Sequence, residues 1–217
     1  MGIFIRDNDK WTEINDFSRY VGGQWQSAQL SRYNGSQWEL LWPMHFPYTV
    51  QYSLSGYVTY AQKGLDLVTY KYLSVGSTGG CFGVYYDTLM FFPLEQMRQD
   101  IGGALSITNA SLTLHRRTND QGEDKAYITL GSALSGMTAE APASSWDVEF
   151  DELLSETVLF NRDQTKTFSF DPQGIWDMIS GAADCLCLPT TADNASEGYS
   201  YADFYPEEAV LTVSYIK

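Results

Sequence analysis

The chain has 217 residues, a formal net charge of −14, 44% hydrophobic residues and 15% aromatic residues. A sequence this rich in apolar side chains can bury a core, which excludes wholesale disorder. The acidic balance of 27 Asp and Glu against 13 Lys and Arg excludes nucleic acid and an anionic bilayer as partners, because both require clustered basic residues.

The first 43 residues repeat one short pattern three times. Each copy has a turn rich in Asn, Asp or Gly, then a Lys or Gln, then a tryptophan. These turn residues tolerate the positive φ angles that tight hairpins require. The pattern therefore predicts short β-hairpins, each with a tryptophan on its second strand.

Such short hairpins are too small to bury large indole side chains by themselves. They either pack on the rest of the chain or dock on another protein, and the repetition favours docking. We therefore expect an attachment segment over residues 1–43, with Pro43 at its boundary, and a second domain over residues 44–217. The candidate assembly residues are the tryptophans of the first segment: Trp11, Trp25, Trp38 and Trp42.

From about Tyr48 the sequence changes to longer stretches of alternating apolar and polar residues. The alternation predicts strands within residues 48–60 (with a break at Gly56), 65–73, 81–92, 110–116 and 209–216. Many short alternating strands separated by turn signals are typical of an antiparallel β-sandwich or jelly roll. The fold class we expect is all-β.

Two helical interruptions are expected within this pattern. Pro93 opens a helix of one or two turns that reaches Gln99. A second helix has Asp171 as its N-cap and Pro172 at its first position, and it ends at Gly181. The apolar face of the second helix should cover the open end of the sandwich.

The three cysteines, Cys81, Cys185 and Cys187, match no zinc-binding spacing. We expect buried free thiols, as in a protein that folds in a reducing cytosol, and no metal or cofactor. The chain does not open with a basic start and an apolar run, and no stretch approaches ~20 apolar residues. Synthesis in the cytoplasm and no contact with a membrane are the corresponding expectations.

Residues that could support catalysis are sparse. Asp147, Glu149 and Asp151 would share one face of a strand, as a glycosidase pair requires, but a solvated acidic face explains them better. Residues 119–124 contain oxygen ligands around a glycine, yet they lack the spacing of a calcium-binding loop, so a polar turn is favoured. We therefore expect no enzymatic activity.

A loop near the C-terminus is the best candidate for binding saccharides. Aromatic faces stack on sugar rings and carboxylates bind hydroxyl groups, and the loop over residues 198–206 offers both. The alternative is that its tyrosines close the edge of the core. The candidate glycan-binding residues are Tyr199, Tyr201, Asp203 and Tyr205.

Three stretches, residues 89–114, 168–181 and 209–215, combine a strand with a short helix or a closing strand. On these stretches residues 81–217 resemble the DNRLRE-type β-sandwich domains of bacterial surface proteins, which are related to carbohydrate-binding jelly rolls. Residues 1–43 are similar to the Gly-x-Trp repeats of minor structural and tail proteins of phages that infect Gram-positive bacteria.

The two resemblances together imply a structural protein of a phage virion, in the tail or baseplate. From the repeated tryptophan hairpins we also expect a homo-oligomer, for which a trimer is favoured, that contacts other virion proteins through residues 1–43. The sandwich would then bind a host cell-wall saccharide. A fibre or decoration protein of the head or neck remains an alternative, and so does a cell-wall glycan hydrolase.

Overall fold

The computed structural model divides the chain into two compact units, Met1–Phe46 and Pro47–Lys217. Within the first unit the description covers only the backbone of the hairpin strands, together with Ser36. Pro43 lies outside the described residues. The described ranges are 3–7, 10–14, 18–21, 24–27, 30–33, 36, 38–42, 47–61, 66–68, 71–78, 84–120, 122–145, 152–190 and 201–217.

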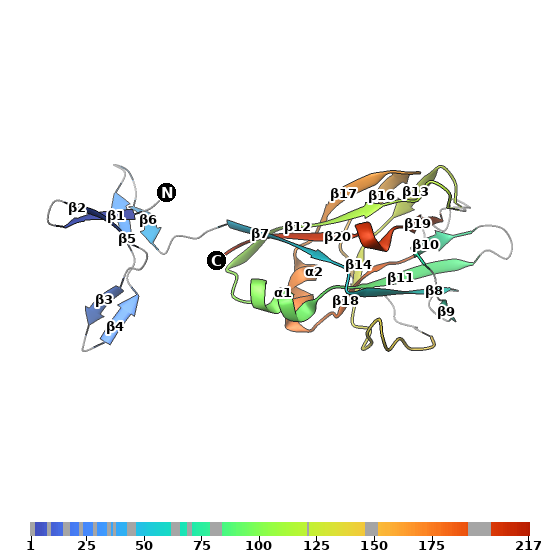
Figure 1. Ribbon diagram of the computed structural model, residues 1–217, viewed down its shortest axis with the longest axis horizontal. Coiled ribbons are helices and arrows are strands. Elements are labelled where there is room, and N and C mark those ends of the chain that lie inside the picture. The colour runs from blue at the N-terminus through green and yellow to red at the C-terminus, as the bar shows by residue number, and fades with distance from the viewer. Residues whose placement is uncertain are drawn as a thin grey trace. The chain divides into compact units, whose positions relative to one another are not determined.

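The described residues of the first unit form three separate antiparallel hairpins, which confirms the prediction from the repeated pattern (Figure 1). Their registers are equivalent, because in each hairpin the tryptophan after the turn pairs with the residue five positions before it. The three pairs are Arg6↔Trp11, Tyr20↔Trp25 and Tyr33↔Trp38. The hairpin strands are β1 (Ile3–Asp7), β2 (Lys10–Ile14), β3 (Ser18–Val21), β4 (Gln24–Ser27), β5 (Leu30–Tyr33) and β6 (Trp38–Trp42).

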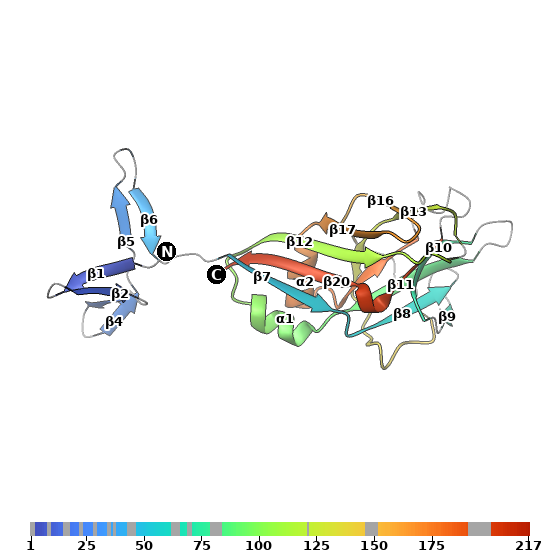
Figure 2. The same ribbon diagram turned by 45° about the horizontal axis from the view of Figure 1, so that its top comes forward.

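The second unit is an antiparallel β-sandwich, as the alternating pattern predicted (Figure 2). Its smaller sheet has four strands in the order β17 (Thr165–Phe170), β12 (Ser106–His115), β20 (Val210–Ile216) and β7 (Pro47–Ser53). Alternate residues of β20 are buried, because one face of this sheet covers the core and the other meets solvent.

The larger sheet has eight strands among the residues that the structure describes. Its main path runs through β15 (Glu152–Leu153), β14 (Gly131–Ala133), β18 (Cys185–Leu188), β11 (Tyr85–Phe91), β10 (Leu73–Ser77) and β19 (Ala202–Phe204), and β8 (Gly56–Ala61) pairs with both β11 and β9 (Asp66–Val68). A separate two-stranded ladder joins β13 (Lys125–Ile128) to β16 (Val158–Asn161).

The chain passes from the smaller to the larger sheet at the predicted break near Gly56, between β7 and β8. A Cβ atom at Gly56 would lie 2.2 Å from the Cβ of Ala139, so only glycine allows this approach. The single strand expected over residues 65–73 is wrong, because β9 ends at Val68 and β10 begins only at Leu73.

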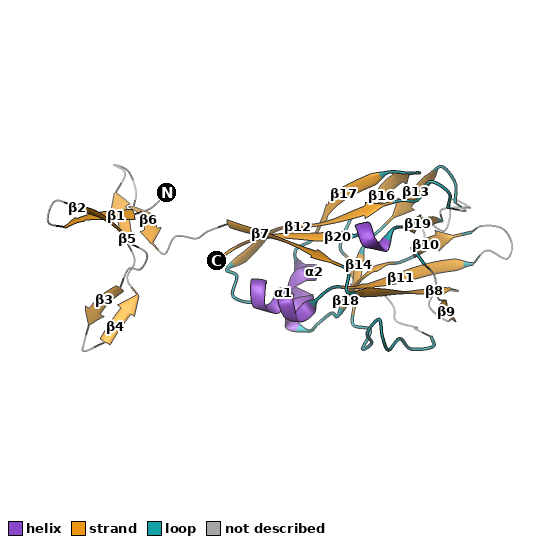
Figure 3. Ribbon diagram, in the orientation of Figure 1, coloured by secondary structure: helices purple, strands orange, loops and turns teal. Residues whose placement is uncertain are grey.

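The two α-helices of the described residues lie together at one end of the sandwich (Figure 3). α1 (Leu94–Ile101) extends beyond the predicted end, and α2 (Gln173–Ser180) begins one residue later than predicted, with Pro172 at the N-cap position. Asp171 still accepts a hydrogen bond from the Gln173 N–H at 2.9 Å. Gly181 ends α2 with a φ of 87°, as expected of a helix-terminating glycine.

Apolar residues are buried on both faces of the larger sheet. Leu186 and Leu188 of β18 belong to the main core between the sheets, whereas Cys185 and Cys187 belong to a second cluster on the opposite face. Burial of both faces explains why β18 is apolar throughout and why β11 ends in the consecutive apolar residues Leu89, Met90 and Phe91 rather than alternating.

Candidate functional site

The two sheets meet at the end of β12. Arg116 forms an isolated antiparallel bridge with Phe204 of β19, and the Arg117 N–H donates to the Asp203 carbonyl at 2.9 Å. Since β12 belongs to the smaller sheet and β19 to the larger one, the run His115, Arg116 and Arg117 lies at the junction between them.

Arg116 holds this junction together from the inside. Its side chain and that of Asp120 are both 0% exposed, and two hydrogen bonds join them, from Nε at 2.7 Å and Nη2 at 3.0 Å. The remaining Arg116 donors bond to the backbone carbonyls of Glu123, Asp124, Phe160 and Tyr201. A buried charge whose donors are all satisfied is a structural clamp.

Next to this clamp, the Asp203 carboxylate is the centre of a second buried network. Its Oδ1 accepts hydrogen bonds from the Tyr201 hydroxyl at 2.6 Å and the Ser74 hydroxyl at 2.7 Å. Its Oδ2 pairs with Nη1 of Arg117 at 3.0 Å. These bonds fix the direction in which the Arg117 side chain extends.

Arg117 begins a row of stacked side chains at the surface. Its guanidinium carbon lies 3.6 Å from the centroid of the Tyr72 ring, within cation–π distance. Tyr72 meets Tyr205 edge to face with centroids 5.9 Å apart, and Tyr205 meets the His115 ring at 5.2 Å. We call Tyr72, Tyr205 and His115 the aromatic row; all three are half-buried.

His115 ends the row between two carboxylates. Its Nδ1 lies 2.7 Å from Glu208 of the 3₁₀ turn η1 (Pro206–Glu208), and its Nε2 lies 3.4 Å from Asp163. Burial acts to lower the pKa of His115, but Glu208 and Asp163 outweigh it and raise the pKa above 6.5. Thr118 also donates to Asp163, at 2.9 Å.

Charged groups of both signs flank the aromatic row. Lys71 and Arg117 lie near the Tyr72 ring, while Asp163 and Glu208, with side chains 65% and 47% exposed, lie beside His115. The surface therefore combines ring faces with both donors and acceptors. A neutral ligand that carries many hydroxyl groups can use all three.

The structure places the predicted glycan-binding residues in two different environments. Tyr205 is the middle member of the aromatic row. Tyr201 and Asp203 are 5% and 6% exposed and belong to the buried network, as in the alternative in which these tyrosines close the edge of the core. Tyr199 lies outside the described residues.

The candidate assembly tryptophans and the acidic group are described only in part or not at all. Trp11, Trp25, Trp38 and Trp42 are placed by their backbone register only. The acidic group Asp147, Glu149 and Asp151 lies outside the described residues.

In the loop considered for calcium, Asp120 is engaged with Arg116. Among the residues that the structure describes, no group of three or more His, Cys, Asp or Glu is placed to hold a metal ion.

Cys185 and Cys187 are buried free thiols, as predicted. Burial is the main cause that raises the pKa of both groups well above the ordinary thiol value. Cys81 lies outside the described residues.

Sequence reasoning missed Tyr72, His115 and Arg117 as members of a site. Tyr72 is far from the other two in sequence, so nothing local connects them. A usable signal was present at residues 115–117, because three consecutive polar or charged residues follow the apolar alternation of β12. Such a run interrupts the apolar alternation at the strand end, although the Arg116 side chain within it is still buried.

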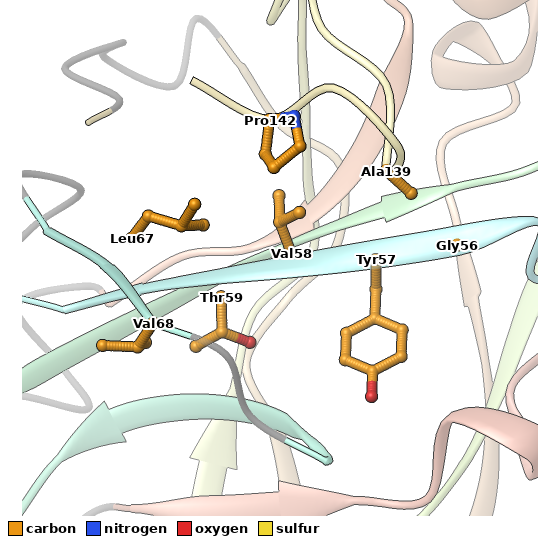
Figure 4. Close-up of a pocket in the computed structure, with 8 residues that line it drawn as sticks. All are labelled: Gly56, Tyr57, Val58, Thr59, Leu67, Val68, Ala139 and Pro142. Carbon is orange, nitrogen blue, oxygen red and sulfur yellow. The ribbon is translucent and has the colours of Figure 1, made fainter. Parts of the chain in front are cut away.

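A cavity of about 370 Å³ lies elsewhere, beside β8 and β9. Figure 4 shows Val58 pointing towards Pro142, whereas Tyr57 and Thr59 point to the other side of β8. None of the described residues that line the cavity carries a charge. It therefore offers less chemistry than the aromatic row.

No protein-family model matches the chain, and no curated protein matches it either. Among the helices of the described residues, none is long and apolar enough to cross a membrane.

Proposed function

We propose that the protein is a structural component of a phage tail or baseplate whose β-sandwich binds neutral saccharides of the host surface at the aromatic row. The observation that carries the binding role is the continuous contact from Arg117 through Tyr72 and Tyr205 to His115 at a partly exposed edge. Half-buried rings held by their neighbours can stack on a sugar without first being ordered, which lowers the entropic cost of binding.

The charges around the row support a neutral saccharide in particular. A hydroxyl group both donates and accepts, so a sugar can bond to Glu208 or Asp163 and also to Lys71. An anionic saccharide would be repelled by the carboxylates beside His115, and a cationic one by Lys71 and Arg117.

The assembly role is supported by the equivalent registers of the three N-terminal hairpins. Trp11, Trp25 and Trp38 occupy the same position relative to their turns. Isolated two-stranded hairpins are marginally stable in water, so a docking partner would stabilise all three in the same way. A homo-oligomer, with a trimer favoured, and contacts to other virion proteins belong to this proposal.

Isothermal titration calorimetry with neutral hexasaccharides, chitohexaose among them, tests the binding role, with hexagalacturonate as the anionic comparison. We expect Tyr205→Ala to weaken binding at least about five-fold, the effect of one lost ring contact. Tyr48→Ala is the matched control, because Tyr48 is a 44% exposed tyrosine on β7 outside the row. Equal binding by both variants, or no binding to a wider array of host cell-wall glycans, contradicts the proposal.

Light scattering on the full chain tests the assembly role. We expect a mass that is a multiple of 24.4 kDa, with three copies favoured. Replacing Trp11, Trp25 and Trp38 together by serine should reduce the mass to that of one copy. A monomeric wild-type protein with its hairpins packed on its own sandwich would overturn this part.

A further inference from the structure

The bonding of His115 identifies its protonation state. Carboxylates of Glu208 and Asp163 lie at the two different ring nitrogens, at 2.7 Å and 3.4 Å. An ionised carboxylate only accepts hydrogen bonds, and a neutral imidazole has a single N–H to donate. Both contacts are satisfied at once only when the ring carries two protons.

The same ion pair holds Tyr205 in place. The Tyr205 N–H donates to the His115 carbonyl at 3.0 Å, and the Glu208 N–H donates to the Tyr205 carbonyl at 3.2 Å. Glu208 then returns to the imidazole of His115. The result is a closed ring of contacts that fixes η1, and with it the Tyr205 ring, on the end of β12.

The charged groups around the imidazole come from two elements. Glu208 comes from η1 and Asp163 from the turn between β16 and β17. The residue that pairs with His115 on β17 is the neutral Thr165, and the Arg117 guanidinium forms an ion pair with Asp203. Loss of a proton from His115 therefore removes the positive charge that lies between the Glu208 and Asp163 carboxylates.

We infer that His115 in its doubly protonated form is the positioning residue of the aromatic row, holding Tyr205 in the orientation that binds a saccharide. This inference rests on the proposed saccharide binding and adds its regulation by pH. Loss of the proton breaks one of the two carboxylate contacts and leaves two acidic groups facing each other across the ring. The η1 turn is then freer to move, and affinity falls.

The direction of the pH effect follows from the raised pKa of His115. The contribution of the His115 ion pairs to stability is fully present below pH 6.5, the pKa of a free histidine. It is lost as the pH rises through the higher pKa that His115 has in the folded protein. Affinity for the saccharide should therefore be highest in mildly acidic solution.

The first measurement does not need a ligand. In a His45→Gln background His115 is the single histidine of the chain, so its ring signals can be titrated by NMR without overlap. We expect a midpoint above 6.5 that falls in Glu208→Gln. Glu207→Gln is the control, because it removes a neighbouring carboxylate of the same turn. A wild-type midpoint at or below 6.5, or equal shifts in the two variants, overturns the inference.

The second measurement follows chitohexaose affinity between pH 5.5 and 8.5 by calorimetry. We expect the wild type to lose about two- to five-fold across this range, the effect of a half-exposed ion pair, and His115→Gln to give a flat profile. A flat wild-type profile despite a raised midpoint overturns the positioning role. If no saccharide binds at any pH, the proposed function fails. The NMR ring signals of Tyr205 then test the positioning role alone: broadened or shifted signals above the midpoint of His115 show that its protonation still positions Tyr205. Unchanged ring signals overturn the inference.

Discussion

Arg116 and Asp120 form a bidentate ion pair in which neither side chain is exposed to solvent. The two residues are four positions apart, so the pair closes the loop that follows β12. The same guanidinium binds carbonyls from three other places in the chain, at Asp124, Phe160 and Tyr201. This one side chain therefore joins the two sheets beneath the aromatic row.

Removing one partner of this pair should be strongly destabilising. Arg116→Met leaves the Asp120 carboxylate buried without its cation, and we expect a loss of about 3–5 kcal/mol in the free energy of unfolding. Urea denaturation followed by circular dichroism measures it. The double variant Arg116→Met, Asp120→Leu should recover part of the loss, because no charge is then left buried. A double variant whose free energy of unfolding is lower than that of Arg116→Met would contradict this explanation.

Gly122 should tolerate no side chain. A Cβ atom there would lie 1.8 Å from the Tyr201 carbonyl oxygen, which is backbone and cannot turn aside. We expect Gly122→Ala to cost about 1–3 kcal/mol. At Gly103 a Cβ would meet nothing within 4 Å, so Gly103→Ala is the matched control and should change the stability by less than about 0.5 kcal/mol. Equal thermal midpoints for the two variants would show that the loop adapts.

The thiols of Cys185 and Cys187 should be unreactive in the folded protein. Both are 0% exposed, and burial raises the pKa of each thiol, so little thiolate forms at neutral pH. In a Cys81→Ser background we expect Ellman's reagent to label neither until urea unfolds the chain. Leu134→Cys places a thiol at a 56% exposed position and should react at once. Rapid labelling of Cys185 or Cys187 without urea would mean that the folded protein opens locally around these thiols.

The ion pair of His115 should make stability depend on pH. The pKa of His115 is raised, so the extra stability of the wild type over Glu208→Gln should be largest below pH 6.5 and shrink as the pH rises above the folded pKa. Glu208 is about half exposed, so we expect less than about 1 kcal/mol. Chemical denaturation at pH 5.5 and 8.5 measures this. A difference that grows with pH has the wrong sign for this mechanism.

Local periodicity predicted part of the secondary structure, but it did not predict the short strands β13 to β16, β18 and β19. The alternation over residues 110–116 and 209–216 predicted the C-terminal part of β12 and all of β20, because a strand with one buried face imposes a period of two on its own sequence. Gly56 was recognised because a glycine interrupts the alternating pattern, and Gly181 because helices commonly end at a glycine with a positive φ. The hairpins of the first unit followed from their turn residues.

The candidate site could not be predicted in this way. Alternation places Tyr201, Asp203 and Tyr205 on one face, but it does not say whether another layer covers that face. The bridge between Arg116 and Phe204 brings together segments almost ninety residues apart. It buries Tyr201 and Asp203 and leaves Tyr205 partly exposed between Tyr72 and His115.

The sequence by itself therefore determined the all-β class, the repeated hairpins and the helix that ends at Gly181, because short-range geometry leaves its mark on neighbouring residues. Only the tertiary structure decided that Arg116 is a buried clamp, that Arg117 supports a surface ring and that His115 lies between two carboxylates. Those three consecutive residues look alike in the sequence. Their roles differ because each meets a different set of distant partners when the two sheets come together.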